Sequence, residues 1–304
     1  MDKIIEVSDL HKSYGEVHAV KGISFYVEKG KLFSFLGPNG AGKSTTIDII
    51  CTFLKPDNGH VIVDGHKLGE NDDAIRSCIG VVFQQNMLDK LLTVEENIRF
   101  RAGLYGLKGK ALNDTVKKVS SDLGITNLLK RPYGNLSGGQ RRLCDIARAL
   151  VHSPKILFLD EPTTGLDPQA RKNIWETILR LQRETSMTVF MTTHYMEEAA
   201  QADYVIVIDK GTIAAKGTPS ELKEEYSHDK LILIGNDAEQ LAGLLEKDGI
   251  AFNASSDRLV INIPSTMDSL NIIEKYRSYL ASFEVTMGTM DDAFISITGK
   301  EMRE

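Results

Sequence analysis

The chain has 304 residues, of which 42% are hydrophobic and 26% charged, a composition typical of a globular protein with room for two domains. Its net charge of -6 provides no overall basic field that would collect the phosphates of a nucleic acid, so we expect no nucleic-acid partner. Its three cysteines are an odd number without metal-ligand spacing, and we expect reduced thiols in a cytosolic protein.

The amino terminus and the longest apolar runs indicate whether the protein is secreted or crosses a membrane. Charged residues at positions 2, 3 and 6 interrupt the apolar stretch that a signal peptide would need, so secretion is not expected. The longest apolar runs, such as 204–208 and 156–159, have the length of a strand and cannot cross about 30 Å of hydrocarbon. Any function at a membrane is therefore expected to require a partner chain.

The first half of the chain reads as a sheet domain with a helical insertion. Short β-rich runs lie at 4–7, 19–27 and 60–63, and the apolar strand 32–36 leads into a glycine-rich loop. A helix is predicted from about Lys43 to the proline and glycine at 55–59, followed by a strand at 80–84. From about 87 to 150 the pattern becomes helical and highly charged, which predicts an inserted helical subdomain.

The second half contains the end of this domain and a smaller one. Strands at 155–159 and 188–192 flank a helix at 174–183, an alternation that favours a parallel sheet, and a hairpin at 204–215 closes it. After a charged helix that ends near Tyr226, a new series starts at 230. The predicted segments are 230–234, 238–247, 251–253, 258–263, 266–279, 283–287 and 291–298. The first six follow the split βαβ, ferredoxin-like order.

Residues 37–44, Gly-Pro-Asn-Gly-Ala-Gly-Lys-Ser, fit the phosphate-loop pattern between a predicted strand and a predicted helix. The glycines allow backbone N–H groups to surround phosphates at a helix amino terminus, which favours anions. Lys43 should reach the β- and γ-phosphates, and Ser44 should give its hydroxyl to Mg²⁺. The predicted nucleotide ligands here are Gly37, Pro38, Asn39, Gly40, Ala41, Gly42, Lys43, Ser44 and Thr45. The alternative is a glycine turn that only starts a helix.

The apolar strand at 155–159 is followed by two carboxylates, Asp160 and Glu161, at the end of a strand where parallel sheets hold their ligands. Asp160 is predicted to orient Mg²⁺ or its water. Glu161 is predicted to polarise the attacking water as a general base. Adjacent acids at a strand end are otherwise common as solvated turn residues, so this interpretation depends on the phosphate loop.

Leu136-Ser137-Gly138-Gly139-Gln140 precedes a helix that runs to about His152, and its hydroxyl and N–H groups form a second anion-binding helix terminus. With the two motifs above, the chain resembles the ATP-binding-cassette (ABC) family, whose signature is this pentapeptide. The resemblance implies an α/β fold: a P-loop NTPase (RecA-like) core with an antiparallel β subdomain and the helical insertion. It implies an ATPase domain at 1–220, with the helical subdomain at about 87–150, and a small α+β domain at 228–304.

The resemblance also implies roles for single residues. Tyr14 matches the aromatic residue that stacks on the adenine, and His194 matches the switch histidine near the γ-phosphate. Gln84 matches the glutamine that contacts Mg²⁺ and the attacking water, with Gln85 as a rival for that role. The predicted catalytic residues are Glu161, His194 and Gln84, and the predicted Mg²⁺ ligands are Ser44, Gln84 and Asp160.

In that family the signature of one domain caps the ATP held by another, so Ser137, Gly139 and Gln140 would act across an interface. Asp167 matches the loop through which two such domains touch. The resemblance therefore implies ATP and Mg²⁺ as ligands and a second ATP-binding subunit, expected to be a copy of this chain.

The run 291–299 looks like the ending of the daunorubicin-resistance type of export ATPases, which serve permeases of the ABC-2 class. This implies the motor of an exporter, bound to a separate permease on the cytoplasmic face of the membrane. Two alternatives are a soluble, non-transporting cassette ATPase and an ATPase that drives mechanical signalling. Too few positions separate Lys43 from Ser137 for the coiled-coil insertion of chromosome-maintenance members, whereas mechanical signalling stays open.

Overall fold

The computed structural model describes residues 2–299 and divides the chain into two compact units, Met1–Lys216 and Gly217–Glu304. Residue 1 and residues 300–304, which the predicted domains include, lie outside the described residues. The segment between the two predicted domains is a helix, α8 (Pro219–Tyr226), and belongs to the second unit.

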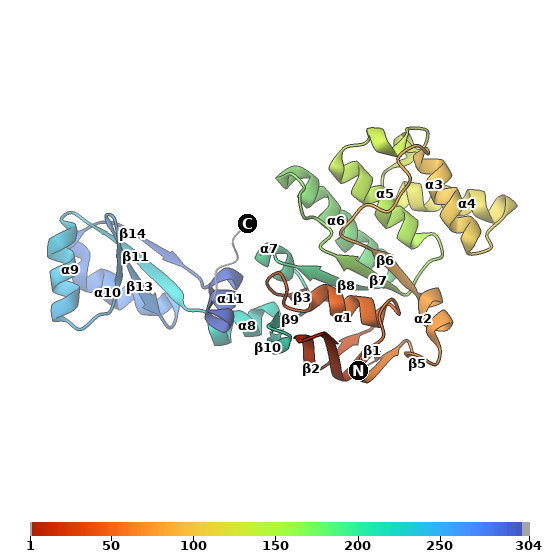
Figure 1. Cartoon of the computed structure of the whole chain (residues 1–304). Helices are drawn as coiled ribbons and strands as arrows, with labels where there is room; N and C mark the ends of the chain where they lie inside the picture. Colours follow the sequence, from red (N-terminus) through yellow and green to blue (C-terminus); the bar gives the residue numbers. More distant parts are fainter. Residues whose placement is uncertain (1, 300–304) are drawn as a thin grey trace. The chain divides into compact units, whose positions relative to one another are not determined.

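A six-stranded sheet forms the centre of the first unit, in the order β10-β9-β3-β8-β7-β6 (Figure 1). Its strands are β3 (Leu32–Leu36), β6 (Ile79–Val82), β7 (Ile156–Asp160), β8 (Thr188–Thr193), β9 (Tyr204–Asp209) and β10 (Thr212–Gly217). β3 runs parallel to β8 and β9, and β7 runs parallel to β6 and β8. Leu36 pairs with Thr193 and Asp160 with Thr192, so the chain leaves three neighbouring strands at one edge of the sheet.

A second, antiparallel sheet has the order β2-β1-β4-β5. Its strands are β1 (Lys3–Tyr14), β2 (Val17–Glu28), β4 (Asn58–Val63) and β5 (His66–Lys67). β1 and β2 are longer than the predicted strands at 4–7 and 19–27. The register shifts between Val7 and Leu10, and such irregularities break the alternation of apolar and polar residues from which strand ends are predicted.

Helices complete the first unit. Those of the sheet domain are α1 (Lys43–Ile50), α2 (Asp72–Cys78), α6 (Pro168–Thr185) and α7 (Met196–Ala199), and those of the helical insertion are α3 (Val94–Leu104), α4 (Gly109–Asp122) and α5 (Gly138–Leu150). α3 and α5 each begin with a reciprocal capping box, Thr93 with Glu96 and Ser137 with Gln140. Within residues 2–299, no helix has the length and apolar character needed to span a bilayer.

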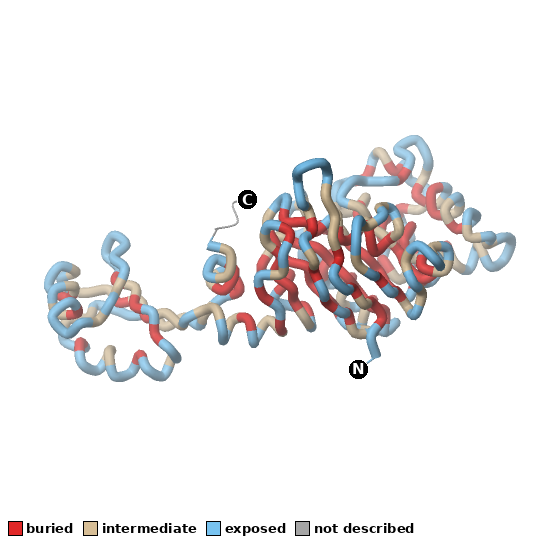
Figure 2. Tube along the Cα trace, turned by 60° about the horizontal axis from the view of Figure 1, so that its bottom comes forward, coloured by how far each residue is buried: buried red, intermediate tan, exposed pale blue. Residues whose placement is uncertain are grey.

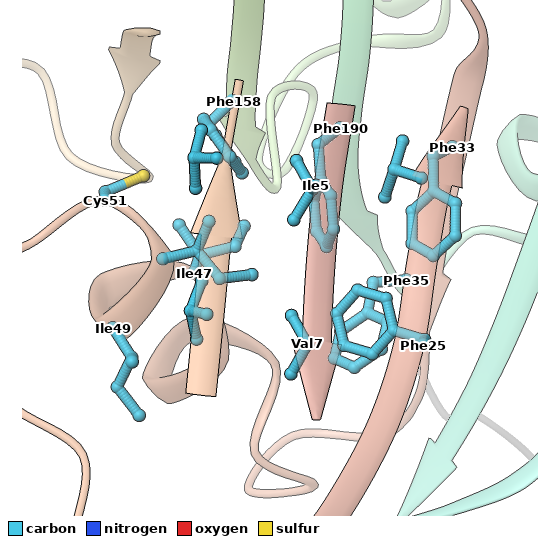
Figure 3. Packing of buried hydrophobic residues seen from close by; sticks show 14 of the residues in the cluster. Ile5, Val7, Phe25, Phe33, Phe35, Ile47, Ile49, Cys51, Phe158 and Phe190 are labelled. Atoms are coloured by element: carbon cyan, nitrogen blue, oxygen red, sulfur yellow. The ribbon is translucent and has the colours of Figure 1, made fainter. Parts of the chain in front are cut away.

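Both sheets and α1 contribute to one hydrophobic cluster (Figure 3). The ring of Phe190 on β8 lies at its centre, with ring centroids 4.9 Å from Phe33, 5.2 Å from Phe158 and 5.8 Å from Phe35. Buried residues follow the strands of this unit in Figure 2. The central strands are apolar on both faces because the sheet is covered on both sides, as parallel sheets require.

The second unit has its own sheet, in the order β12-β13-β11-β14. Its elements after α8 are β11 (Asp229–Gly235), α9 (Ala238–Lys247), β12 (Asn253–Ser255), β13 (Arg258–Ile263), α10 (Ser269–Tyr276), β14 (Leu280–Thr286) and α11 (Met290–Thr298). All its pairings are antiparallel, which is the split βαβ arrangement predicted from the sequence. Leu231, Leu233, Leu241 and Leu245 belong to a separate buried cluster, so this unit has a core of its own.

We predict that Phe190→Ala destabilises the protein by about 3–5 kcal/mol, because it leaves a cavity among aromatic rings that are fixed by two sheets. Urea unfolding followed by circular dichroism would measure this loss. Phe100→Ala is the matched control, since Phe100 is 68% exposed and its removal should change the free energy of unfolding by only about 0.5 kcal/mol. Equal effects of the two substitutions would contradict the central role of Phe190.

Candidate active site

The loop between β3 and α1 packs directly against the backbone of neighbouring segments. A Cβ atom on Gly37 would lie 2.3 Å from the carbonyl oxygen of Ile208, and one on Gly42 would lie 2.5 Å from that of Ala19. Gly40 and Gly42 also have positive φ angles, of 78° and 105°. Glycine is therefore required in this loop for both space and conformation. No side chain caps the amino terminus of α1, so its first N–H groups can bind an anion.

Lys43 is a buried cation at this loop. Its ammonium donates hydrogen bonds to the carbonyl oxygens of Gly37, at 2.7 Å, and Pro38, at 3.2 Å, and lies 3.4 Å from Oε1 of Glu161. Burial lowers the pKa of Lys43, and the carboxylates of Glu161 and Asp160 oppose that shift. The ammonium thus lies on the loop that was predicted to hold phosphates.

Ser44 and Asp160, two of the predicted Mg²⁺ ligands, lie side by side. The Ser44 hydroxyl donates to Oδ1 of Asp160 at 3.3 Å, and the Thr192 hydroxyl donates to the same oxygen at 2.6 Å. A hydroxyl and a carboxylate next to a phosphate loop are the oxygen ligands that Mg²⁺ takes in such sites, so this pair fits the ion. The third predicted ligand, Gln84, donates its amide to Oε2 of Glu161 at 3.3 Å.

Glu161 brings the predicted catalytic residues together. Besides Lys43 and Gln84, its carboxylate meets the hydroxyl of Thr164, which donates to Oε2 at 3.2 Å, and Nδ1 of His194, at 3.4 Å from Oε2. The His194 nitrogen therefore faces Oε2 at a distance longer than that of a well-formed hydrogen bond. Residues from three separate segments of the chain therefore converge on one carboxylate.

These neighbours set the charge of Glu161. His194 contributes most to lowering the pKa of its carboxyl to about 2, and Lys43 and the Thr164 hydroxyl add to this against the opposing effect of burial. Glu161 is only 8% exposed and is ionised across the physiological pH range. A buried, ionised carboxylate of this kind can accept a hydrogen bond from a water molecule and orient it.

The backbone of Glu161 is held in an unusual conformation. Its φ angle is 44°, in the left-handed region that non-glycine residues seldom adopt. Its N–H donates to the Thr192 hydroxyl at 3.0 Å, and its carbonyl oxygen accepts a hydrogen bond from Arg142 at 2.9 Å. Strained residues of this kind persist where the surrounding contacts fix them, which is common in active sites.

Sequence reasoning missed the residues that hold these loops: Thr192, Thr164, Arg142 and Glu198. Glu198 of α7 is buried and accepts hydrogen bonds from the hydroxyls of Thr163 and of Thr193, the latter at 2.6 Å. Burial raises the pKa of Glu198, and these two hydroxyls oppose the shift. The signal that marks Glu198 is a charged residue at a buried position of a short helix. Its burial cannot be read from the sequence before the fold is known.

The remaining predicted residues lie away from this cluster. Tyr14 ends β1 and is half exposed, with the Lys12 ammonium 5.9 Å from the centre of its ring. Asp167 caps α6, where its carboxylate accepts the N–H of Ala170 at 2.9 Å. Gly139 allows close contact with α6, since a Cβ atom there would lie 2.9 Å from that of Ala170.

Ser137 and Gln140 bind each other at the start of α5. The side chain of Gln140 accepts the Ser137 N–H at 3.1 Å, and the Ser137 hydroxyl accepts the Gln140 N–H at 3.3 Å. In the part of the chain that the structure describes, no hydrogen bond or ion pair joins these residues or Gly139 to the loop 37–44. Within the described residues of one chain, the signature and the phosphate loop thus share no direct polar contact.

Comparison with known proteins identifies the group to which this arrangement belongs. The family model described as ABC transporter matches residues 20–164. The daunorubicin/doxorubicin resistance ATP-binding protein DrrA of Streptomyces peucetius is 36% identical over 307 residues, covering 98% of this chain and 93% of that protein. The probable multidrug ABC transporter ATP-binding protein YbhF of Escherichia coli K12 is 38% identical over 229 residues. That match covers 75% of this chain but only 39% of the length of YbhF.

Solved structures agree with this assignment. The ATP-binding cassette MJ0796, in a dimeric post-hydrolysis state bound to ADP and Pi, superposes with a TM-score of 0.64 at 29% identity. The match covers 70% of this chain and 98% of that chain. The predicted mixed α/β fold is thereby confirmed.

The low pKa of Glu161 predicts a pH-dependent contribution to stability. Because its folded-state pKa of about 2 lies below the ordinary 4.5, ionised Glu161 stabilises the fold above pH 4.5, and this stabilisation is lost as the pH falls toward 2. The difference in free energy of unfolding between the wild type and Glu161→Gln should therefore be smaller at about pH 3.5 than at about pH 7. Urea titrations at the two pH values measure it, and a constant difference would contradict the pKa assignment.

Proposed function

Because the chain belongs to the family of ABC transporter ATP-binding proteins, we propose that it is the ATP-hydrolysing motor of an exporter whose membrane-spanning part is a separate ABC-2 permease. The observation that carries this proposal is the convergence of Lys43, Gln84, Glu161 and His194 beside the uncapped start of α1. Export is supported by the relatives, which are named for drug resistance and multidrug transport. The transported substrate is determined by the permease.

Different residues of the site have different roles in ATP binding and hydrolysis. The N–H groups of the loop 37–42 and of α1, together with the Lys43 ammonium, bind the phosphates of ATP, and Tyr14 stacks on the adenine. Mg²⁺, held by Ser44, Asp160 and Gln84, would neutralise charge on the β- and γ-phosphates. Glu161 orients the water that attacks the γ-phosphate, and His194 and Gln84 hold the Glu161 carboxylate in place.

We further propose that two copies of the chain form the complete site. The start of α5, with Ser137, Gly139 and Gln140, has hydroxyl and N–H groups suited to an anion, and in the described residues it makes no polar contact with its own phosphate loop. A second copy would place these groups over the ATP and bring Asp167 to the interface. The dimeric state of the related cassette supports this arrangement.

A groove in the first unit suits contact with the permease. It encloses about 440 Å³ between β6, α2, α3 and α5, and Phe53, Val81, Phe83 and Leu104 line it. Phe53 and Leu104 are both more than half exposed, an apolar surface that is typical of a binding site for another protein. Binding of the permease here would hold the chain at the cytoplasmic face of the membrane, beside the strand that leads to Gln84.

We predict that Glu161→Gln hydrolyses ATP about 100-fold more slowly than the wild type or worse, yet dimerises when ATP is added. Phosphate release measures the first effect, and light scattering coupled to gel filtration measures the second. Glu176→Gln, which changes an exposed acid on α6, should leave both properties unchanged. A Glu161→Gln protein that stays monomeric with saturating ATP and Mg²⁺ would contradict the composite site.

A second prediction concerns the groove. Leu104→Asp places a charge on its apolar wall and should abolish co-purification with the proposed permease. Its basal ATP hydrolysis should equal that of the wild type, because Leu104 lies outside the catalytic cluster. Leu91→Asp is the control, since Leu91 is 90% exposed and does not line the groove. Unimpaired co-purification of Leu104→Asp would exclude this groove as the docking site.

A further inference from the structure

Arg142, in the second turn of α5, is a buried cation bonded to the backbone of two loops. It is 4% exposed, and its guanidinium donates to four carbonyl oxygens. Two belong to the loop after β7: Glu161 at 2.9 Å and Pro162 at 2.5 Å. The other two belong to the segment after β6: Phe83 at 2.5 Å and Gln84 at 3.4 Å.

This arrangement fixes the two loops relative to each other. A buried charge without partners is strongly unfavourable. The hydrogen bonds of Arg142 go to these four carbonyl oxygens, and the carboxylates of Asp145 and Asp160 also interact favourably with its charge. Its set of hydrogen bonds is therefore complete only while both loops are in place. The guanidinium is a rigid planar fork, so it also sets the distance between the backbones of Gln84 and Glu161. The left-handed backbone of Glu161 depends on contacts of this kind.

Two further buried side chains on the same face of α5 hold the segment that contains Gln84. Asp145 accepts the N–H of Met87 at 3.2 Å, and Arg148 donates to the carbonyl oxygen of Val81 at 2.5 Å. Three successive turns of α5 thus bind residues 81–87. Among the three side chains, only Arg142 also binds the loop of Glu161, which makes it the link between the helix and the catalytic carboxylate.

We propose that Arg142 is a positioning residue for ATP hydrolysis that couples the two composite sites of the dimer. Arg142 lies one helical turn from Gly139, which belongs to the signature. Under the proposed function, the signature contacts the ATP bound by the partner subunit. This inference rests on that function. When the signature binds that ATP, α5 is fixed, and Arg142 fixes Glu161 and Gln84 at the ATP of its own chain. Occupation of one site therefore promotes hydrolysis at the other.

The test compares steady-state hydrolysis by the full-length wild type, Arg142→Gln and Arg142→Lys. Arg142→Gln should lower kcat about 10- to 100-fold with little change in KM for ATP, because it displaces Glu161 and leaves the phosphate loop intact. The Hill coefficient should exceed one in the wild type and fall to one in this variant. Arg142→Lys should be intermediate, since an ammonium cannot span both loops.

Arg148→Gln is the matched control. It removes a buried arginine from the same helix that binds only the segment of Gln84 and not the loop of Glu161. It should lower the melting temperature as Arg142→Gln does, but it should lower kcat less than Arg142→Gln and leave the Hill coefficient above one. Equal kinetic effects of the two substitutions would reduce Arg142 to a structural role and overturn the proposal. So would an unchanged kcat in folded Arg142→Gln, or a wild-type Hill coefficient of one.

Two measurements separate this inference from the proposed function. If Arg142→Gln does not fold, Arg142→Lys decides the outcome by the same kinetic criteria. Glu161→Gln/Arg142→Lys should dimerise with ATP as Glu161→Gln does, because Arg142 does not bind the nucleotide. If Glu161→Gln itself stays monomeric, the proposed function fails. If it dimerises while the Arg142 variants hydrolyse ATP like the wild type, the inference about Arg142 alone fails.

Discussion

The buried pair of Lys43 and Glu161 is the constraint on which the rest of the first unit depends. Their charged atoms lie 3.4 Å apart at the edge where β3 and β7 end, and both side chains are more than 90% buried. Two charges can be kept from water only if every remaining polar atom has a partner. The carbonyls of the loop around Lys43 and the side chains of Gln84 and Thr164 around Glu161 supply such partners.

The loops that carry these residues are fixed by side chains and not by the sheet. Glu161 follows the last residue of β7, where ladder hydrogen bonds no longer hold the backbone. Thr192, Arg142 and Glu198 supply the missing contacts: the first two bind Glu161 itself, and Glu198 binds the threonines beside Glu161 and His194. The rigidity that catalysis needs is therefore built from buried polar contacts, which are strong where water is excluded.

The second unit is stabilised in a different way from the catalytic loops. Its leucine-rich core is independent of the catalytic site, and its strand order follows from the alternation of strands and helices along the sequence. The predicted helix at 266–279 consists of α10 between two 3₁₀ turns, Thr266–Asp268 and Arg277–Tyr279. Hydrophobic periodicity does not distinguish α10 from the second turn, because the residues that belong to the core, Ile272, Ile273, Tyr276 and Tyr279, recur at helical spacing through both.

The sequence alone determined the order of strands and helices, the phosphate loop and the carboxylates at the end of β7, because local spacing and glycine requirements specify them. It did not determine Arg142, Thr192 or Glu198, whose partners lie between 5 and 59 positions away in the chain. A charged residue in a helix pattern suggests solvent until the tertiary structure shows a neighbouring carbonyl or hydroxyl. Only folding brings these groups together. Their contacts are strong only in the packed protein, because water is excluded there.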